Sequence, residues 1–170
     1  RLCDGLFSGV YRFDGELLHH VAHHNYTPEA LEEVQRKFPA RPTRDFGTGR
    51  AILEGAVVHI PDVEVDPEYR NQPLSRAVGM RSGLFVPMLR EGAPIGVIFV
   101  ARAEPGPFSS SELDLVKTFA DQAVIAVENV RLFTELEART GELTRSVEKL
   151  TALGEVSRAV SSTLDVETVL

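Results

Sequence analysis

Four of the five histidines lie in the run HHVAHH, residues 19–24, and are the first candidates for metal binding. On a helix, His19 and His23 would share one face, a spacing that suits two ligands of one ion. The Asp14-Gly15 pair before the run predicts a hairpin turn instead, so the run is expected to be a strand. Strand residues four apart are separated by about 13 Å, at about 3.3 Å per residue. We therefore expect half-buried strand histidines and no metal site.

A second group of chemically active residues is the acidic run DVEVDPE, which contains Asp62, Glu64, Asp66 and Glu68. Four carboxylates could bind a cation or carry out acid–base catalysis. An Asp-Pro pair is also typical of a helix start, which favours a capping role within a solvated loop. No phosphate loop, nucleophile elbow or zinc-protease helix occurs elsewhere in the chain. The sequence thus predicts no catalytic residue, and it specifies no cofactor.

Composition narrows the classes of partner. The 170 residues carry a formal net charge of −7, and 43% of them are hydrophobic. Nucleic-acid binding needs clustered lysine and arginine, which are absent, and no apolar run is long enough to insert into a membrane. The single Cys3 excludes an internal disulfide and is expected to be a small buried hydrophobe. We expect a cytoplasmic globular domain with an appended segment.

Hydrophobic periodicity and turn residues predict an α+β domain with a mostly antiparallel sheet covered by helices. A ligand pocket is expected on the face that carries the middle helices and loops. The predicted elements, in chain order, are strands at 5–13 and 16–24, helices at 27–38 and 47–55, a short strand at 56–63, irregular turns at 66–79, strands at 81–89 and 93–102, and a long helix.

The long helix is predicted to begin after Ser109, with Glu112 completing a capping box and Phe108 packing on Leu113. Helix-compatible sequence continues to about residue 153. Its first part has two apolar stripes, and a helix with two apolar faces must bury both. We expect one stripe to cover the sheet and the other to meet a second subunit. The first stripe contains Leu113, Val116, Ala120, Ala123, Val127 and Val130, and the second contains Leu115, Phe119, Ile125 and Leu132.

The later part of this helix has the seam of a coiled coil, which predicts a homodimer joined through its terminal helices. The seam residues are Phe133, Leu136, Thr140, Leu143, Val147 and Leu150. All of these except Thr140, together with Val116, Ala123, Val127 and Val130 of the first stripe, are expected to form the dimer and signalling helix. Gly141 weakens the helix interior, and the seam slips at Leu153 and Gly154. We therefore expect a globular domain at 1–133, a connector helix at 134–153 and the start of another helix at 154–170.

Four segments, in this order, resemble the GAF domain of bacterial signalling proteins. They are GVYRFDGELLHHVAHHNYTPEAL, GTGRAILEGAVVHIPDVEVDPEY, GMRSGLFVPMLREGAPIGVIFVAR and FSSSELDLVKTFADQAVIAVENVRLF. The resemblance covers about residues 5–133. It implies a six-stranded antiparallel sheet flanked by helices, a small-ligand pocket between the sheet and the middle loops, and dimerisation through terminal helices. The segment LTALGEVSRAVSSTLDVETVL is similar to the lead helix of a second such module, which implies a tandem sensor before an output domain such as a histidine kinase.

The resemblance implies pocket residues Phe46, Tyr69, Met80 and Arg81, of which Arg81 could meet an anion. The sequence also departs from several branches of the family. It lacks the signature of cyclic-GMP-binding members and the pocket cysteine of bilin-binding photoreceptors. A single cysteine cannot form the disulfide relay of the methionine-sulfoxide-reducing members. A haem ligand among His20, His24 and His59 stays open.

Three functions are compatible with these observations. The first is a cytoplasmic sensor domain that binds a small molecule, dimerises and relays a signal through its C-terminal helix. The second is a ligand-free structural and dimerisation module, which a pocket filled by Phe85 or Phe99 would favour. The third is a small-molecule reductase or hydrolase, whose only redox group would be Cys3.

Overall fold

The computed structural model describes the backbone of residues 7–167 and the side chains of residues 7–151, 153 and 154. Cys3 and residues 168–170 lie outside the described residues. The chain forms two compact units, residues 1–125 and 126–170. No helix in residues 7–167 combines the length and the apolar character that crossing a bilayer requires.

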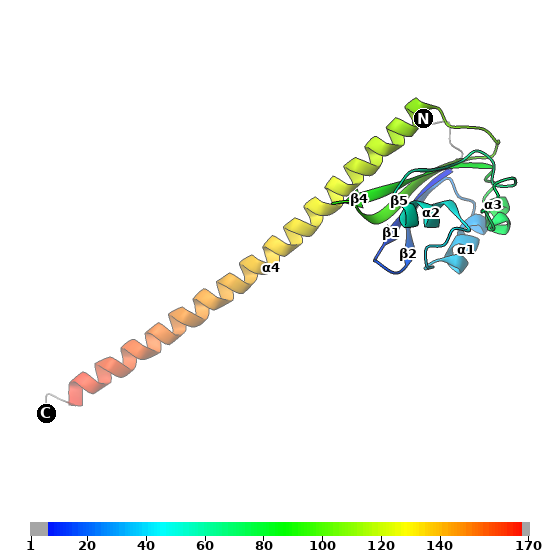
Figure 1. The fold of residues 1–170 in the computed structure, drawn as a ribbon. Helices are drawn as coiled ribbons and strands as arrows, with labels where there is room; N and C mark the ends of the chain where they lie inside the picture. Colours follow the sequence, from blue (N-terminus) through cyan, green and yellow to red (C-terminus); the bar gives the residue numbers. More distant parts are fainter. Residues whose placement is uncertain (1–6, 168–170) are drawn as a thin grey trace. The chain divides into compact units, whose positions relative to one another are not determined.

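One sheet of five strands organises the first unit, in the spatial order β2-β1-β5-β4-β3 (Figure 1). Every neighbouring pair is antiparallel, which agrees with the predicted α+β class. Strands β4 and β5 are joined by a tight turn in which Glu91 and Gly92 both have positive φ angles. The strands are β1 (Phe7–Phe13), β2 (Leu18–His24), β3 (Val58–Ile60), β4 (Ser82–Arg90) and β5 (Ala93–Arg102).

In the described residues, 7–167, the sheet has five strands, and the expectation of six was wrong. The segment beside the edge strand β2 pairs with it only through an isolated bridge between Leu18 and Ala40. Both backbone bonds of that bridge form, at 2.8 and 3.1 Å. Pro39 and Pro42 flank Ala40 closely, and proline has no N–H to donate to a ladder. The pairing consequently does not extend into a strand.

Alternate residues of the sheet feed two hydrophobic clusters, one on each face. On β4, Phe85 belongs to the cluster shared with α1 and α2, whereas Leu84 and Val86 belong to the cluster shared with the long helix α4. Figure 1 shows the short helices and the first turns of α4, which belong to the first unit, on opposite sides of the sheet. The helices are α1 (Pro28–Lys37), α2 (Gly47–Glu54), α3 (Gln72–Ala77) and α4 (Ser110–Glu167).

The ends of the short helices follow local sequence signals. Thr27 caps α1 by accepting a bond from the Ala30 N–H at 3.1 Å, as the Thr-Pro start predicts. Gly55 ends α2 in the left-handed conformation, with φ of 59°. The Asp66-Pro67 pair does not begin a helix. The short helix of this region, α3, starts later, at Gln72. There Pro73 occupies the first turn, where its missing N–H costs nothing.

A bulge in the first hairpin changes the register of the histidine run. Val10 pairs with Ala22 and Tyr11 pairs with His20, so Val21 is the extra residue on β2. An extra residue reverses the in–out alternation of the residues beyond it. His20 and His23 therefore share one face, although simple alternation places them on opposite faces.

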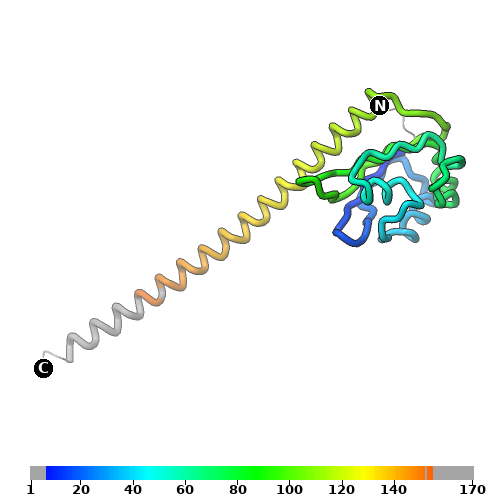
Figure 2. Tube along the Cα trace, in the orientation of Figure 1, coloured from blue at the N-terminus to red at the C-terminus, as the bar shows by residue number. Residues whose placement is uncertain are grey.

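Helix α4 begins with the predicted capping box. The Ser109 N–H donates to Glu112 Oε2 at 2.8 Å, and the Glu112 N–H donates to Ser109 Oγ at 3.3 Å. Figure 2 traces the chain from this cap along the helix. The helix is continuous through Gly141 and Gly154, beyond the predicted limit near residue 153. In the second unit Arg131 and Arg139 both pair with Glu135 one turn away.

Candidate ligand-binding site

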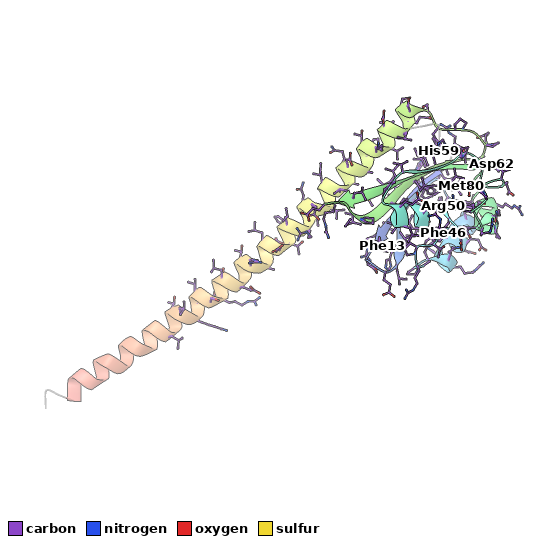
Figure 3. The ribbon with its side chains drawn as sticks, in the orientation of Figure 1. Phe13, Phe46, Arg50, His59, Asp62 and Met80 are labelled. Atoms are coloured by element: carbon purple, nitrogen blue, oxygen red, sulfur yellow. The ribbon has the colours of Figure 1, made fainter. Side chains whose placement is uncertain are left out.

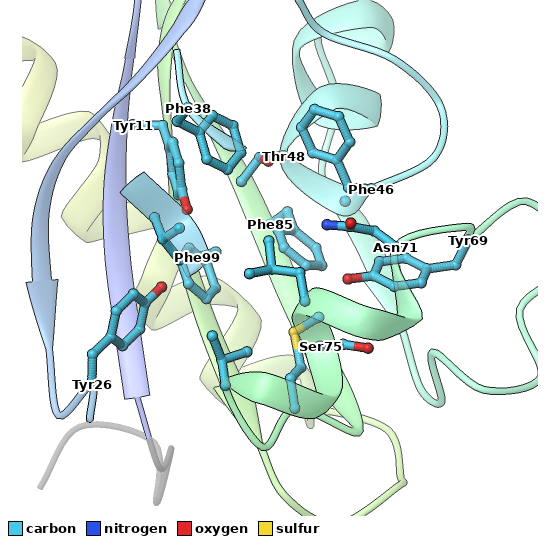
Figure 4. Close-up of a pocket in the computed structure, with 15 residues that line it drawn as sticks. Tyr11, Tyr26, Phe38, Phe46, Thr48, Tyr69, Asn71, Ser75, Phe85 and Phe99 are labelled. Carbon is cyan, nitrogen blue, oxygen red and sulfur yellow. The ribbon is translucent and has the colours of Figure 1, made fainter. Parts of the chain in front are cut away.

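A small cavity lies between the sheet and the short helices, in the first unit (Figure 4). Its volume is about 40 Å³. A water molecule occupies roughly 10–15 Å³ by the same measure, so the cavity has room for about three. The lining residues are Tyr11, Tyr26, Val34, Phe38, Phe46, Gly47, Thr48, Tyr69, Asn71, Leu74, Ser75, Val78, Met80, Phe85 and Phe99.

Three tyrosine hydroxyl groups are the main polar groups of the cavity. Burial raises the pKa of Tyr11, Tyr26 and Tyr69 above the ordinary value for a phenol. All three are therefore protonated at neutral pH, and each can donate or accept a hydrogen bond. The cavity thus presents neutral hydrogen-bonding groups on aromatic walls.

A buried ion pair holds the loop that covers this cavity. Arg50 on α2 is 6% exposed, and its guanidinium contacts both carboxylate oxygens of Asp66, at 3.1 and 2.5 Å. Asp66 Oδ1 in turn accepts bonds from the N–H groups of Glu68 and Tyr69. Figure 3 shows Phe46, Arg50 and Met80 on the side of the sheet that carries α2 and α3. Arg50 therefore fixes the position of Tyr69 in the cavity wall.

Three of the four predicted pocket residues line the cavity, namely Phe46, Tyr69 and Met80. Arg81 is not among the lining residues. Its guanidinium contacts Asp62 at 3.1 and 2.6 Å, and its side chain is 42% exposed. The charge of Arg81 is used to hold the end of the acidic loop.

Sequence reasoning did not single out most of the cavity wall. Tyr11 and Phe38 come from β1 and from the end of α1, and Asn71 and Ser75 come from the region of α3. The sequence feature that could have indicated Tyr11 is its inward position in the first hairpin, because a buried tyrosine hydroxyl needs a hydrogen-bond partner. Asn71 and Ser75 lie in the segment predicted to form irregular turns, for which the sequence does not predict which side chains face the core.

Each carboxylate of the acidic run pairs with an arginine. Asp62 pairs with Arg81, Glu64 with Arg76, Asp66 with Arg50, and Glu68 with Arg44. These contacts lower the pKa of the Asp62, Glu64 and Asp66 carboxyls through hydrogen bonds from the guanidinium groups. Within the part of the chain that the structure describes, no group of three or more His, Cys, Asp or Glu side chains could hold a metal ion.

The bulge in β2 stacks two histidines beside the tyrosines of the cavity. The His20 ring lies 5.3 Å from His23 and 5.8 Å from Tyr26, and it also packs at 5.2 Å on Tyr11. The Nε2 atom of His20 is buried without a hydrogen-bond partner. Burial, and then the charge of His23, lower the pKa of His20 below its ordinary value of 6.5.

We expect the free energy of unfolding to fall as the pH is lowered from 7.5 to 5.5. In this range the unfolded chain protonates His20 near pH 6.5, whereas the fold resists that proton, so acid favours unfolding. The variant His20→Phe keeps the ring stack and should show a shallower loss of melting temperature. His24→Gln is the control, since His24 is exposed. Equal pH slopes for His20→Phe and the wild type would contradict this assignment.

The first turns of α4 pack against the sheet. Val116 is 3% exposed and belongs, with the partly buried Ala123, to the cluster on that face. The predicted stripe thus covers the sheet at Val116 and Ala123, and Val116 has no surface left for a second subunit. The other helix residues predicted for dimerisation are exposed; they are Val127, Val130, Phe133, Leu136, Leu143, Val147 and Leu150.

An antiparallel sheet with short helices on one face and the first turns of α4 on the other agrees with the fold that the family resemblance implied, apart from the sixth strand. The model of the GAF domain family matches residues 2–128. The chain belongs to the GAF domain family. No curated protein matches its sequence.

Solved structures with the same GAF fold have low sequence identity. A GAF domain/HD domain protein from Geobacter sulfurreducens has a TM-score of 0.63 at 20% identity, over 76% of this chain and 84% of that one. A domain from Sinorhizobium meliloti, described as part of a putative two-component sensor histidine kinase, has a TM-score of 0.60 at 18% identity, over 75% and 81%. A type II free methionine-R-sulfoxide reductase from Thermoplasma acidophilum has a TM-score of 0.58 at 20% identity, over 74% and 80%.

Proposed function

We propose that this GAF domain is a cytoplasmic sensor module without catalytic activity of its own. A small molecule binds in the tyrosine-lined cavity, and the chain forms a homodimer through α4. Binding changes the arrangement of the paired helices, and a downstream output domain such as a histidine kinase reads the change. A ligand can act in this way only if it binds the two helix arrangements with different affinity.

The observation that carries the sensing role is the cavity itself. It is lined by aromatic and aliphatic side chains and by a few hydroxyl and amide groups, the composition typical of small-molecule sites. The loop over it is fixed by Arg50 and Asp66. A bound molecule would therefore contact the sheet and this loop together.

Dimerisation is supported by the exposed seam of α4. Leu136, Leu143 and Leu150 are 65%, 68% and 69% exposed and recur at a spacing of seven residues. Full burial of one such side chain stabilises by about 1.5–3 kcal/mol. Pairing with a second copy of the same helix would bury the seam residues of both helices.

We expect a solvent extract of the purified protein to contain one compound that is depleted in the variant Gly47→Ala. A Cβ at Gly47 would lie 2.1 Å from Cε2 of Phe85, so the ring must move. Phe99 stacks on the Phe85 ring and Gly83 lies against it, so the free space into which this ring can move is the cavity. The measurement is mass spectrometry of extracts from equal amounts of protein.

The control for this comparison is Gly141→Ala, because a Cβ at Gly141 meets no atom within 4 Å. Its extract should match that of the wild type. Identical extracts from all three proteins would contradict a ligand held in the cavity.

The ligand-free structural module remains a second candidate, and the size of the cavity favours it. About 40 Å³ is far below the roughly 300–1,000 Å³ of sites for drug-sized ligands. Phe85 and Phe99 stack against each other in the wall, at 5.7 Å between ring centroids. Extracts free of any bound compound, together with a stable dimer, would favour this candidate.

A further inference from the structure

Five aromatic rings form a continuous arc around the cavity. In order they are Phe46, Phe38, Tyr11, Phe99 and Phe85, and the distances between successive ring centroids are 5.8, 4.6, 6.0 and 5.7 Å. The arc returns to the start of α2, because the Phe85 ring lies against Gly47, the residue that follows Phe46. Aromatic walls on several sides favour a flat, apolar guest.

The cavity wall carries no charge in the part of the chain that the structure describes. A cation that contacts the wall is Lys37, whose ammonium donates to Asn71 Oδ1 at 3.1 Å and lies 4.9 Å from the Phe46 centroid. Moving a charged group from water into such surroundings costs several kcal/mol unless a partner meets it there. The wall therefore selects against an ionised ligand.

Hydroxyl groups reach the cavity from opposite sides. Figure 4 shows those of Tyr11 and Tyr26 directed inward from one wall and that of Tyr69 from the other. All three are protonated phenols that can both donate and accept. A guest with one polar atom at its edge can therefore form a hydrogen bond while its ring stays among the aromatic walls.

We infer that the cavity takes a small, neutral, planar aromatic molecule that carries one hydroxyl or ring N–H group. This inference rests on the proposed sensing function. The present volume is smaller than a six-membered ring needs, so binding displaces a wall ring.

The test is a titration of the 170-residue protein, followed by NMR chemical shifts, with phenol, benzoate and cyclohexanol as probes. Phenol is neutral and planar, benzoate adds a charge to the same ring, and cyclohexanol keeps the hydroxyl but loses the planar ring. Phenol is expected to bind at least tenfold more tightly than either of the others, with shifts at the residues of the arc.

Two variants locate the polar contact. Tyr26→Phe and Tyr69→Phe each remove one hydroxyl and keep the ring. At least one of them should weaken phenol binding by about two- to tenfold, the loss of one neutral hydrogen bond. Neither should change the binding of benzene by more than twofold. Gly47→Ala should abolish the binding of both probes.

Several results would overturn the inference. Tighter binding of benzoate than of phenol would point to an anion held by Lys37, and equal binding of cyclohexanol would show that the rings do not select planarity. Phenol binding that survives in Gly47→Ala would lie outside the cavity. If no probe binds but another compound copurifies, the ligand class is wrong and the sensing function stands. If no probe binds and nothing copurifies, both fail.

Discussion

The variant Arg50→Met is expected to lose about 3–5 kcal/mol of unfolding free energy, the usual cost of breaking a buried ion pair from one side. Arg50 is 6% exposed, and the side chain of its partner Asp66 is 17% exposed. Without the guanidinium, that carboxylate keeps its charge and loses its partner. The loss should appear as a lower midpoint in urea unfolding, monitored by circular dichroism.

The control is Arg76→Met, which breaks the pair with Glu64. The side chain of Arg76 is 68% exposed, so this change should cost much less than Arg50→Met. The double variant Arg50→Met/Asp66→Asn should regain part of the loss, because the introduced amide is neutral and its oxygen can still accept the loop N–H groups. Equal costs for the two single variants would contradict the structural role given to Arg50.

The double variant Leu136→Glu/Leu143→Glu is expected to be monomeric at concentrations at which the wild type is a dimer. Both residues lie on the seam of α4, where each dimer would bring together four carboxylates. Buried carboxylates without partners cost several kcal/mol each, so the dissociation constant should rise by at least about a hundredfold. Sedimentation equilibrium measures this constant directly.

The matched control is Thr134→Glu/Ala138→Glu, which adds the same charge to exposed helix positions outside the seam. It should dimerise within about threefold of the wild type. A seam variant that dimerises as well as this control would show that the helices do not pair along these residues.

Local signals predicted most of the fold. The Asp14-Gly15 pair predicted the first hairpin, whose turn spans residues 14–17, and the Thr27 cap and the Ser109–Glu112 capping box are also present. The sixth strand was wrong because it came from the family resemblance, and the prolines beside Ala40 limit pairing there to one bridge. The number of strands that is typical of a family does not reflect a local change of this kind.

The candidate site was less accessible to sequence reasoning. Phe46, Tyr69 and Met80 could be placed near a pocket, but the partner of Arg81 depends on how the acidic loop folds. The stack of His20 on His23 depends on one bulged residue, which reverses the alternation of the strand. Features of this kind depend on tertiary packing and not on spacing in the sequence.

Native mass spectrometry of the purified chain, beside its denatured mass, is the most direct test of a dimeric small-molecule sensor. One spectrum reports both the number of subunits and any bound mass. We expect a dimer in which each subunit carries the same extra mass, and this extra mass should be missing from Gly47→Ala. A monomer at the bare polypeptide mass would contradict both the seam on α4 and the occupied cavity.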